Sequence, residues 1–246
     1  MTLDDPRRSI LAENLKRCRD LMAGAAERSG RDRSGVKLFP VTKYVDASVV
    51  RLLHDLGERD FAERTVQRGD ALRTELADLQ GARWHLVGHL QRNKVARALE
   101  VFASIHSLDS LRLAQEIGSR ARAGGSSLPD LFVEVNIGAE PRKTGLPLEE
   151  VRNLLSALVR IFPSADGVPP VAGLMTMAPL PPQGAPAGEA ARPVFRKLRE
   201  LRDELVSERL LAPGAGLSMG MSGDFEAAIE EGATVVRIGS MLYEGL

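Results

Sequence analysis

The chain of 246 residues is long enough to form one large α/β barrel or two smaller domains. Lysine plus arginine and aspartate plus glutamate number 33 each, so no net charge favours nucleic acid or a membrane surface as a partner. Cys18 is the only cysteine, which excludes an internal disulfide and a four-cysteine metal site. The first residues lack an apolar secretory segment and no apolar run is long enough to cross a bilayer, so we expect a cytoplasmic protein.

Hydrophobic residues alternate along the chain between helical spacing and short β-branched runs, after a first amphipathic helix predicted near residues 10–22. Eight strands are predicted, in chain order, at Val36–Thr42, Arg59–Glu63, Trp84–Gly88, Ser104–Leu108, Leu131–Ile137, Val171–Met177, Gly216–Met219 and Thr234–Ile238. Helices are predicted between them at Ala47–Leu56, Arg64–Leu79, from Arg92 onward, Ser110–Ala123, Leu148–Phe162, Pro193–Glu208 and Asp224–Glu230. Asp46, Asp109 and Ser222 are candidate N-caps for three of these helices.

This regular alternation of strand and helix demands a parallel sheet with right-handed crossovers. Eight such units in about 250 residues match the size of a (β/α)8 TIM barrel. We therefore predict one TIM-barrel domain over residues 1–246, with an additional N-terminal helix. A doubly wound open sheet is the alternative, which is less favoured because no Gly-x-Gly-x-x-Gly follows the first strand and no Walker loop is present.

Lys43 follows the first predicted strand and is the central candidate for chemistry. A lysine at the C-terminal end of a buried strand loses hydration, which makes its neutral, nucleophilic form accessible for Schiff-base formation. A solvated loop lysine is the alternative for this residue taken alone. Other polar strand ends should converge with it on the mouth of the barrel, and lysine, asparagine, threonine, serine and arginine together suit a phosphorylated aldehyde held by a lysine.

Two turns rich in small residues follow the seventh and eighth predicted strands, at Leu217–Asp224 and Val235–Ser240. Backbone N–H groups in such turns, with the hydroxyl of Ser222, are predicted to form an anion cradle. Loops after strands seven and eight are the recurrent phosphate site of the TIM barrel. Two ordinary tight turns are the alternative interpretation.

Arg237 should lie inside the barrel mouth, where a buried guanidinium needs an acceptor. It either pairs with a strand-end carboxylate such as Glu63 or Glu134, or it donates to a ring nitrogen of a bound cofactor. The sequence leaves both possibilities open. His85 and His89 are not expected to bind a metal, because a strand-to-loop segment does not align residues four apart and no glutamate follows His85.

Six blocks of sequence occur in an order that matches a known family. They are Val41–Lys43, Trp84–Lys94, Ile105–Asp109, Gly173–Ala178, Leu217–Asp224 and Val236–Ser240. Over nearly the whole chain they resemble the YggS/PROSC family of pyridoxal 5′-phosphate (PLP) homeostasis proteins, which are related to the N-terminal barrel of alanine racemase. The tryptophan–histidine block and the Ser-Met-Gly-Met-Ser block are the most specific parts of this resemblance.

The resemblance implies that Lys43 forms the internal aldimine with PLP, that Arg237 faces the pyridine nitrogen and that the phosphate rests on Ser222, Gly239 and Ser240. Further strand-end residues are expected among the cofactor contacts, namely Glu63, Arg64, Ser107, Asn136, Met175 and Ser218. One segment departs from the family, which usually has an asparagine near the cofactor where this chain has Arg64. Arg64 would either supply charge toward the phosphate or narrow the mouth.

The resemblance implies a PLP carrier or regulator in PLP homeostasis, usually monomeric, with apo forms of PLP-dependent enzymes as candidate recipients. An arginine at the pyridine nitrogen keeps that nitrogen unprotonated, so the ring is a weak electron sink and efficient turnover is not expected. Two alternatives stay open. One is a slow PLP-dependent amino-acid racemase, and the other is a cofactor-free aldolase that uses Lys43 alone.

Overall fold

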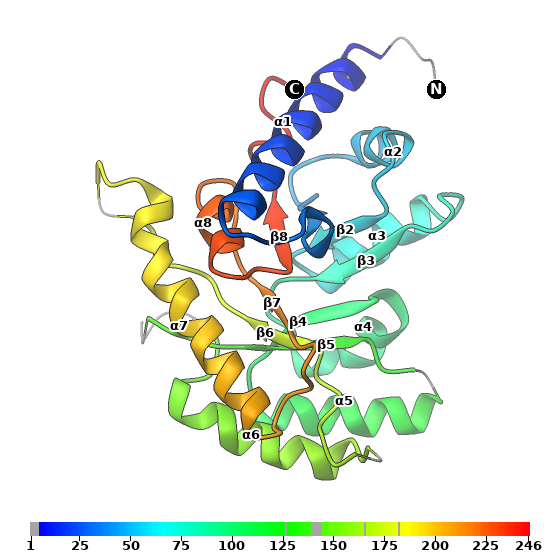
Figure 1. Cartoon of the computed structure of the whole chain (residues 1–246). Coiled ribbons are helices and arrows are strands. Elements are labelled where there is room, and N and C mark those ends of the chain that lie inside the picture. The colour runs from blue at the N-terminus through cyan, green and yellow to red at the C-terminus, as the bar shows by residue number, and fades with distance from the viewer. Residues whose placement is uncertain (1–4, 126, 139–143, 165, 182) are drawn as a thin grey trace.

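The computed structural model describes residues 5–125, 127–138, 144–164, 166–181 and 183–246, in which strands and helices alternate around a central barrel (Figure 1). The strands are β1 Lys37–Pro40, β2 Asp60–Glu63, β3 Arg83–Leu86, β4 Ser104–Leu108, β5 Asp130–Glu134, β6 Gly173–Met175, β7 Gly216–Ser218 and β8 Val235–Ile238. The α-helices are α1 Pro6–Arg28, α2 Ala47–Asp55, α3 Val66–Glu75, α4 Val95–Val101, α5 Leu111–Gly124, α6 Leu148–Ile161, α7 Ala187–Ser207 and α8 Phe225–Glu230. Two 3-10 turns precede β1 and α4, at Arg33–Gly35 and Arg92–Lys94.

The eight strands run parallel in the order β1-β8-β7-β6-β5-β4-β3-β2. The sheet closes between its two outer strands, where Val41 pairs with Ala62 in a parallel bridge and the Thr42 amide donates to the Ala62 carbonyl at 3.0 Å. Each strand except β8 is followed by a helix, and α1 precedes the barrel. The predicted (β/α)8 TIM barrel with an additional N-terminal helix is therefore confirmed.

The N-caps differ in part from the prediction. Asp46 does cap α2, because its side chain accepts a hydrogen bond from the Val49 amide at 3.1 Å. Asp109 was wrong as a cap, since the neighbouring Ser110 accepts from the Leu113 amide and begins α5. Ser222 was also wrong as a cap, because α8 begins after Asp224.

Helix α7 begins at Ala187, well before the predicted start at Pro193. Proline is common in the first turn of a helix, which is why the sequence favoured a start there. In the structure Pro193 lies inside α7 and costs one backbone hydrogen bond, while Pro186 precedes the first residue. The buried side chains of Phe195, Leu198 and Leu201 hold the helix against the barrel.

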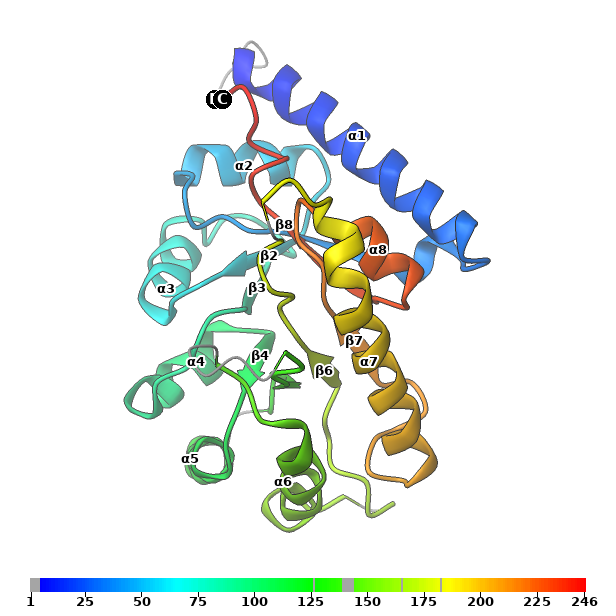
Figure 2. The same ribbon diagram turned by 90° about the vertical axis from the view of Figure 1, so that its left-hand side faces the viewer.

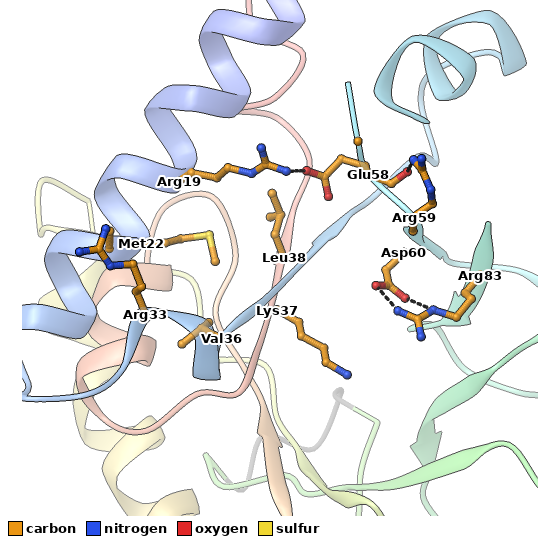
Figure 3. Close-up of a pocket in the computed structure, with 12 residues that line it drawn as sticks. Arg19, Met22, Arg33, Val36, Lys37, Leu38, Glu58, Arg59, Asp60 and Arg83 are labelled. Carbon is orange, nitrogen blue, oxygen red and sulfur yellow. Dashed lines mark hydrogen bonds and ion pairs between the residues drawn. The ribbon is translucent and has the colours of Figure 1, made fainter. Parts of the chain in front are cut away.

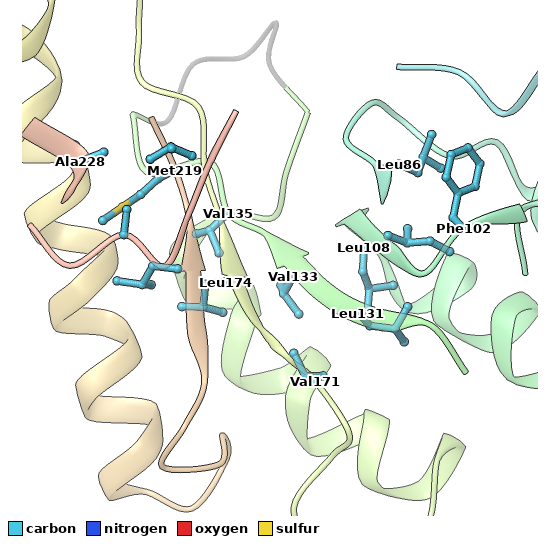
Figure 4. Packing of buried hydrophobic residues seen from close by; sticks show 14 of the residues in the cluster. Leu86, Phe102, Leu108, Leu131, Val133, Val135, Val171, Leu174, Met219 and Ala228 are labelled. Carbon is cyan, nitrogen blue, oxygen red and sulfur yellow. The ribbon is translucent and has the colours of Figure 1, made fainter. Parts of the chain in front are cut away.

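Most buried hydrophobic residues lie between the strands and the surrounding helices, and Leu86, Leu131 and Leu174 are examples on three strands (Figure 4). The inside of the barrel is different, because aromatic and imidazole rings fill it. Phe39 stacks on His85 with ring centroids 4.0 Å apart, and Phe132 stacks on His106 at 4.2 Å. The barrel interior is thus packed and partly polar.

Helix α1 lies across the side of the barrel that carries α8, and the first turn of α1 lies at the same end of the molecule as the C-terminus (Figures 1 and 2). The Asn14 side chain donates to the carbonyls of Leu242 and Glu244 at 3.1 and 2.9 Å. Helix α1 therefore holds the C-terminal segment in place after β8. Within the described ranges, no helix has the length and apolar character needed to span a bilayer.

Candidate functional site

Two adjoining cavities open at the C-terminal ends of the strands, with volumes of 550 and 290 Å³. Both are lined by Val41, Lys43, Met221 and Arg237, so they are two parts of one site. The larger part, here called the turn cavity, is bounded by the turns after β7 and β8, with Ser222, Gly223, Gly239 and Ser240. The smaller part, the side cavity, is bounded by the ends of β2, β3 and β5, with Arg64, Gly88, His89 and Glu134.

Lys43 lies at the junction of the two cavities, in the turn directly after β1. Its amine has no hydrogen-bond or ion-pair partner within the described part of the chain, and lies 4.5 Å from the centre of the Tyr44 ring. The side chain is half-buried, so it is neither fully desolvated nor an ordinary surface lysine. An unpaired amine in a cavity is available to a ligand.

Hydrogen bonds with Glu63 and Arg68 hold the turn that carries Lys43. Glu63 is fully buried at the end of β2 and accepts from the Thr42 hydroxyl at 2.6 Å and from Arg68 Nε at 3.3 Å. Arg68 also donates to the carbonyls of Thr42 and Val45. Burial raises the pKa of Glu63, while its bonds to Thr42 and Arg68 act in the opposite direction.

The turns after β7 and β8 meet at Ser222. Gly220 has φ of +95°, and a Cβ there would lie 2.6 Å from Ala228, so only glycine allows this bend at the end of β7. The bend brings the Ser222 hydroxyl to the turn after β8, where it accepts long bonds from the amides of Gly239 and Met241, at 3.3 and 3.4 Å. A hydroxyl and two weakly engaged amides are suitable donors for an anionic oxygen.

Arg237 is 5% exposed and reaches the wall shared by both cavities. It donates to the Ser218 hydroxyl at 2.7 Å and to the carbonyls of Ser218 and Thr176, each at 3.0 Å. Burial lowers the pKa of Arg237 to about 10, although the negative charges of Glu134 and Asp224 partly offset this effect. The alternative of an ion pair with Glu63 or Glu134 was wrong, because neutral acceptors take these hydrogen bonds.

The side cavity carries charges of both signs. Arg64 is exposed there and its guanidinium has no hydrogen-bond or ion-pair partner among the residues described. His89 pairs with Asp109 at 3.2 Å, and Glu134 accepts from the Thr144 hydroxyl at 2.5 Å. Burial raises the pKa of Glu134. Arg64 lies in the side cavity, while Ser222, Gly239 and Ser240 line only the turn cavity.

The structure brings about half of the expected site residues together at the cavities. Those that line them are Lys43, Arg64, Ser222, Arg237, Gly239 and Ser240. The others lie in or beside the strands without lining either cavity, namely Glu63, Ser107, Asn136, Met175 and Ser218. Met175 is 1% exposed within β6, and the buried Ser107 hydroxyl has no hydrogen-bond partner in the part of the chain described.

Several residues of the site were not predicted. Met221 lines both cavities and Tyr243 lines the turn cavity, yet a methionine and a tyrosine near a strand end carry no signal for a site by themselves. Arg68 could have been anticipated, because a buried carboxylate such as Glu63 requires a donor nearby. His85 does not face either cavity, since its ring binds Ser104 and Asp60.

The closed parallel barrel and its site belong to a chain whose residues 10–246 match the family model of the alanine racemase N-terminal domain. The pyridoxal phosphate homeostasis protein of Aquifex aeolicus is 41% identical over 231 residues, which are 94% of this chain and 96% of the relative. The chain therefore belongs to the family of pyridoxal phosphate homeostasis proteins.

Two further relatives also match this chain over nearly its whole length. The pyridoxal phosphate homeostasis protein of Pseudomonas aeruginosa is 39% identical over 240 residues, covering 96% of this chain and 95% of the relative. The structure of PipY from Synechococcus elongatus PCC7942 with PLP bound superimposes with a TM-score of 0.77 at 34% identity. That superposition covers 95% of this chain and 99% of PipY.

Proposed function

We propose that this protein binds PLP covalently through Lys43 and acts in intracellular PLP homeostasis as a carrier or regulator. One observation supports this most directly. The unpaired Lys43 amine shares one cavity with the Arg237 guanidinium and with the donors around Ser222. The PLP-bound structure of the relative PipY, at 34% identity, supports the same ligand.

The residues present fit each part of PLP. Lys43 supplies the amine that takes up the aldehyde carbon. Ser222, Gly239 and Ser240 line the turn cavity, where a hydroxyl and backbone amides would hold the phosphate. Arg237 lines the same cavity and has further N–H groups to donate to the ring nitrogen. When bound, PLP supplies a carbonyl for covalent capture of amines and a ring that can accept electron density.

Glu63 and Ser218 act indirectly in this proposal. Glu63 holds the Lys43 turn through Thr42, and Ser218 holds the Arg237 side chain. For Ser107, Asn136 and Met175 a contact with PLP remains our proposal from the family resemblance. Arg64 stands on the side of Lys43 away from the phosphate turns, so we propose that it guides anionic ligands into the mouth.

We further propose that efficient turnover is absent. A guanidinium at the ring nitrogen opposes its protonation and so limits the electron sink. Tyr243 is a poor general base, because burial raises the pKa of its phenol and its oxygen is shielded from solvent. Tyr44 lines the turn cavity but is 82% exposed, so its phenol lies open to solvent and not in an enclosed reaction site. We also propose that the protein is a monomer, that it lies in the cytoplasm and that it supplies PLP to apo-enzymes.

The decisive experiment is borohydride reduction of PLP-loaded protein, followed by peptide mass mapping. We expect one pyridoxyl group on Lys43, and a visible absorption band that is lost in Lys43→Ala. A colourless protein in excess PLP, or an adduct only on other lysines, would contradict the proposal. The same spectrum separates the cofactor-free aldolase, which needs Lys43 but shows no such band.

The slow racemase is tested separately. Fully loaded protein is incubated with alanine or serine in deuterated water, and exchange of the α-proton is followed by NMR. We expect no exchange above the rate given by free PLP. Exchange that depends on Lys43 would establish the racemase instead.

A further inference from the structure

A row of polar side chains crosses the inside of the barrel from one end to the other. Five hydrogen bonds of 2.7–2.8 Å join them in the following order: Asp60, His85, Ser104, His106, Ser218 and Arg237. We call these six residues the interior relay. Its members come from β2, β3, β4, β7 and β8, so the relay exists only in the closed barrel.

The two ends of the relay lie in different cavities. Asp60 lines a cavity of 510 Å³ at the N-terminal ends of β1, β2 and β3, where it is also bound by Arg83 (Figure 3). Arg237 lines the site at the C-terminal ends. The relay therefore joins an anion at one end of the barrel to a cation at the other.

The direction of each hydrogen bond near Asp60 follows from its carboxylate. Burial acts to raise the pKa of Asp60, but hydrogen bonds from His85 and Arg83 outweigh it and lower that pKa to about 2. The ionised carboxylate only accepts, so His85 donates from Nε2. A neutral His85 must then accept at Nδ1, and Ser104 donates its single hydroxyl hydrogen there.

The rest of the relay follows in the same way. The Ser104 hydroxyl donates its hydrogen to His85, so its oxygen accepts a hydrogen bond from Nε2 of His106. His106, when neutral, accepts at Nδ1 from the hydroxyl of Ser218. Ser218 in turn accepts from Arg237, which can only donate. Every bond thus points from Arg237 toward Asp60.

Both imidazoles must be neutral for this arrangement, and their surroundings favour neutrality. Burial is the main cause that lowers the pKa of His85 and of His106, and nearby cations act in the same direction. The hydrogen bond and the charge of Asp60 act to raise the pKa of His85, but they do not outweigh burial and the cations. These cations are Lys37 and Arg83 near His85, and Arg237 near His106. Phe39 and Phe132 stack on the two rings and keep water from them.

We propose that the interior relay is a positioning device, in which Asp60, His85, Ser104, His106 and Ser218 set the orientation of the Arg237 guanidinium at the site. Aligned hydrogen bonds polarise one another, so the charge of Asp60 acts on Arg237 through neutral groups. The guanidinium keeps a fixed face toward the cavity. The consequence for the ligand rests on the proposed function, because it requires that PLP binds beside Arg237.

The first test needs no ligand. In apoprotein labelled with ¹⁵N-histidine, long-range proton–nitrogen spectra at pH 7 distinguish the two neutral tautomers from the imidazolium. We expect His85 and His106 both as neutral Nε2–H forms, with slowly exchanging protons. An Nδ1–H tautomer or an imidazolium at either residue would break the relay and overturn the proposal.

The second test removes the middle of the relay at a distance from Arg237. Ser104→Ala deprives His85 of a donor and His106 of an acceptor, and Ser104→Thr keeps the hydroxyl. We expect Ser104→Ala to shift the guanidinium proton resonances of Arg237 and to redistribute the His106 tautomers. The dissociation constant of PLP should rise by about 3- to 10-fold, as expected for one lost hydrogen bond. Ser104→Thr should restore both readouts.

Thr234→Val is the matched control, because Thr234 makes hydroxyl bonds with the backbone of Leu217 outside the relay. It should lower stability without moving the Arg237 resonances or PLP retention. If Ser104→Ala behaves like this control, the relay is only structural and the proposal fails. If wild-type protein never binds PLP, the proposed function fails, while the apoprotein spectra still decide whether the relay positions Arg237.

Discussion

Thr42 donates its hydroxyl hydrogen to Glu63 at 2.6 Å, one residue before Lys43. In the described part of the chain, the backbone pairing that joins the end of β1 to β2 is the isolated bridge between Val41 and Ala62, so backbone bonds close the barrel weakly at this point. The Thr42–Glu63 bond strengthens the closure where the Lys43 side chain emerges. The position of Lys43 therefore depends on a carboxylate that lies beneath the cavity.

Replacing Glu63 by glutamine should change how stability depends on pH. Burial raises the pKa of Glu63 above its ordinary value of 4.5, so the folded protein binds this proton more tightly than the unfolded chain. The contribution of Glu63 to stability is complete below the unfolded pKa and declines as pH rises toward the folded pKa. Glu63→Gln removes this decline. Denaturant unfolding between pH 4 and 8 should show the variant gaining stability relative to wild type as pH rises.

Glu149→Gln is the control for this comparison, because Glu149 is exposed on α6. Its stability should follow that of wild type at every pH. If the free energy of unfolding of Glu63→Gln differed from that of wild type by the same amount at every pH from 4 to 8, the pKa of Glu63 would not be raised.

Ser222→Ala should weaken PLP retention. The variant removes the one side-chain hydroxyl that joins the turns after β7 and β8. A hydrogen bond to a charged group contributes about 1.5–3 kcal/mol, so the dissociation constant should rise by roughly 10- to 100-fold. Equilibrium dialysis of PLP measures it. Ser9→Ala on α1 is the control, and an unchanged constant for Ser222→Ala would place the phosphate elsewhere.

The barrel could be predicted because each buried strand has its own apolar run and each helix its own spacing. The small residues after β7 and β8 likewise indicated close turns, and the structure brings Ser222 to Gly239. Cap choice was less certain. Asp109 and Ser110 are equally good caps by residue type, and only the backbone conformation, which the sequence does not reveal, decides for Ser110.

The direction of side chains on the strands could not be predicted. Neighbouring residues on a strand face opposite sides, so an error of one position moves a side chain from the cavity to the core. Met175, which was expected among the cofactor contacts, is 1% exposed within β6 and lines neither cavity, so its contact with PLP stays a prediction. The contact between Ser218 and Arg237 likewise depends on the register of β7 against β8, which pairs Ser218 with Val235.

Arg64→Asn, which introduces the residue that the family resemblance leads us to expect there, should slow PLP capture. Arg64 is an exposed cation without a partner among the described residues, so it raises the positive potential at the mouth. We expect the association rate to fall by about 2- to 5-fold at low salt and the difference to vanish at high salt, since screening removes such steering. Stopped-flow absorbance measures both. Arg160→Asn in the last turn of α6 has the same charge change at the opposite end of the barrel and should leave the rate unchanged.

Gly88→Ala should destabilise the protein and displace Arg64. An added Cβ at Gly88 would lie 2.2 Å from the Arg64 carbonyl oxygen and 2.7 Å from Arg64 Cγ. The backbone after β2 must then move, and overpacking of this kind costs about 1–3 kcal/mol. Gly35→Ala is the matched control, because a Cβ at Gly35 meets nothing within 4 Å and its φ is not positive. Urea unfolding should show the loss for Gly88→Ala alone, and equal stability of the two variants would mean that Arg64 does not pack over Gly88.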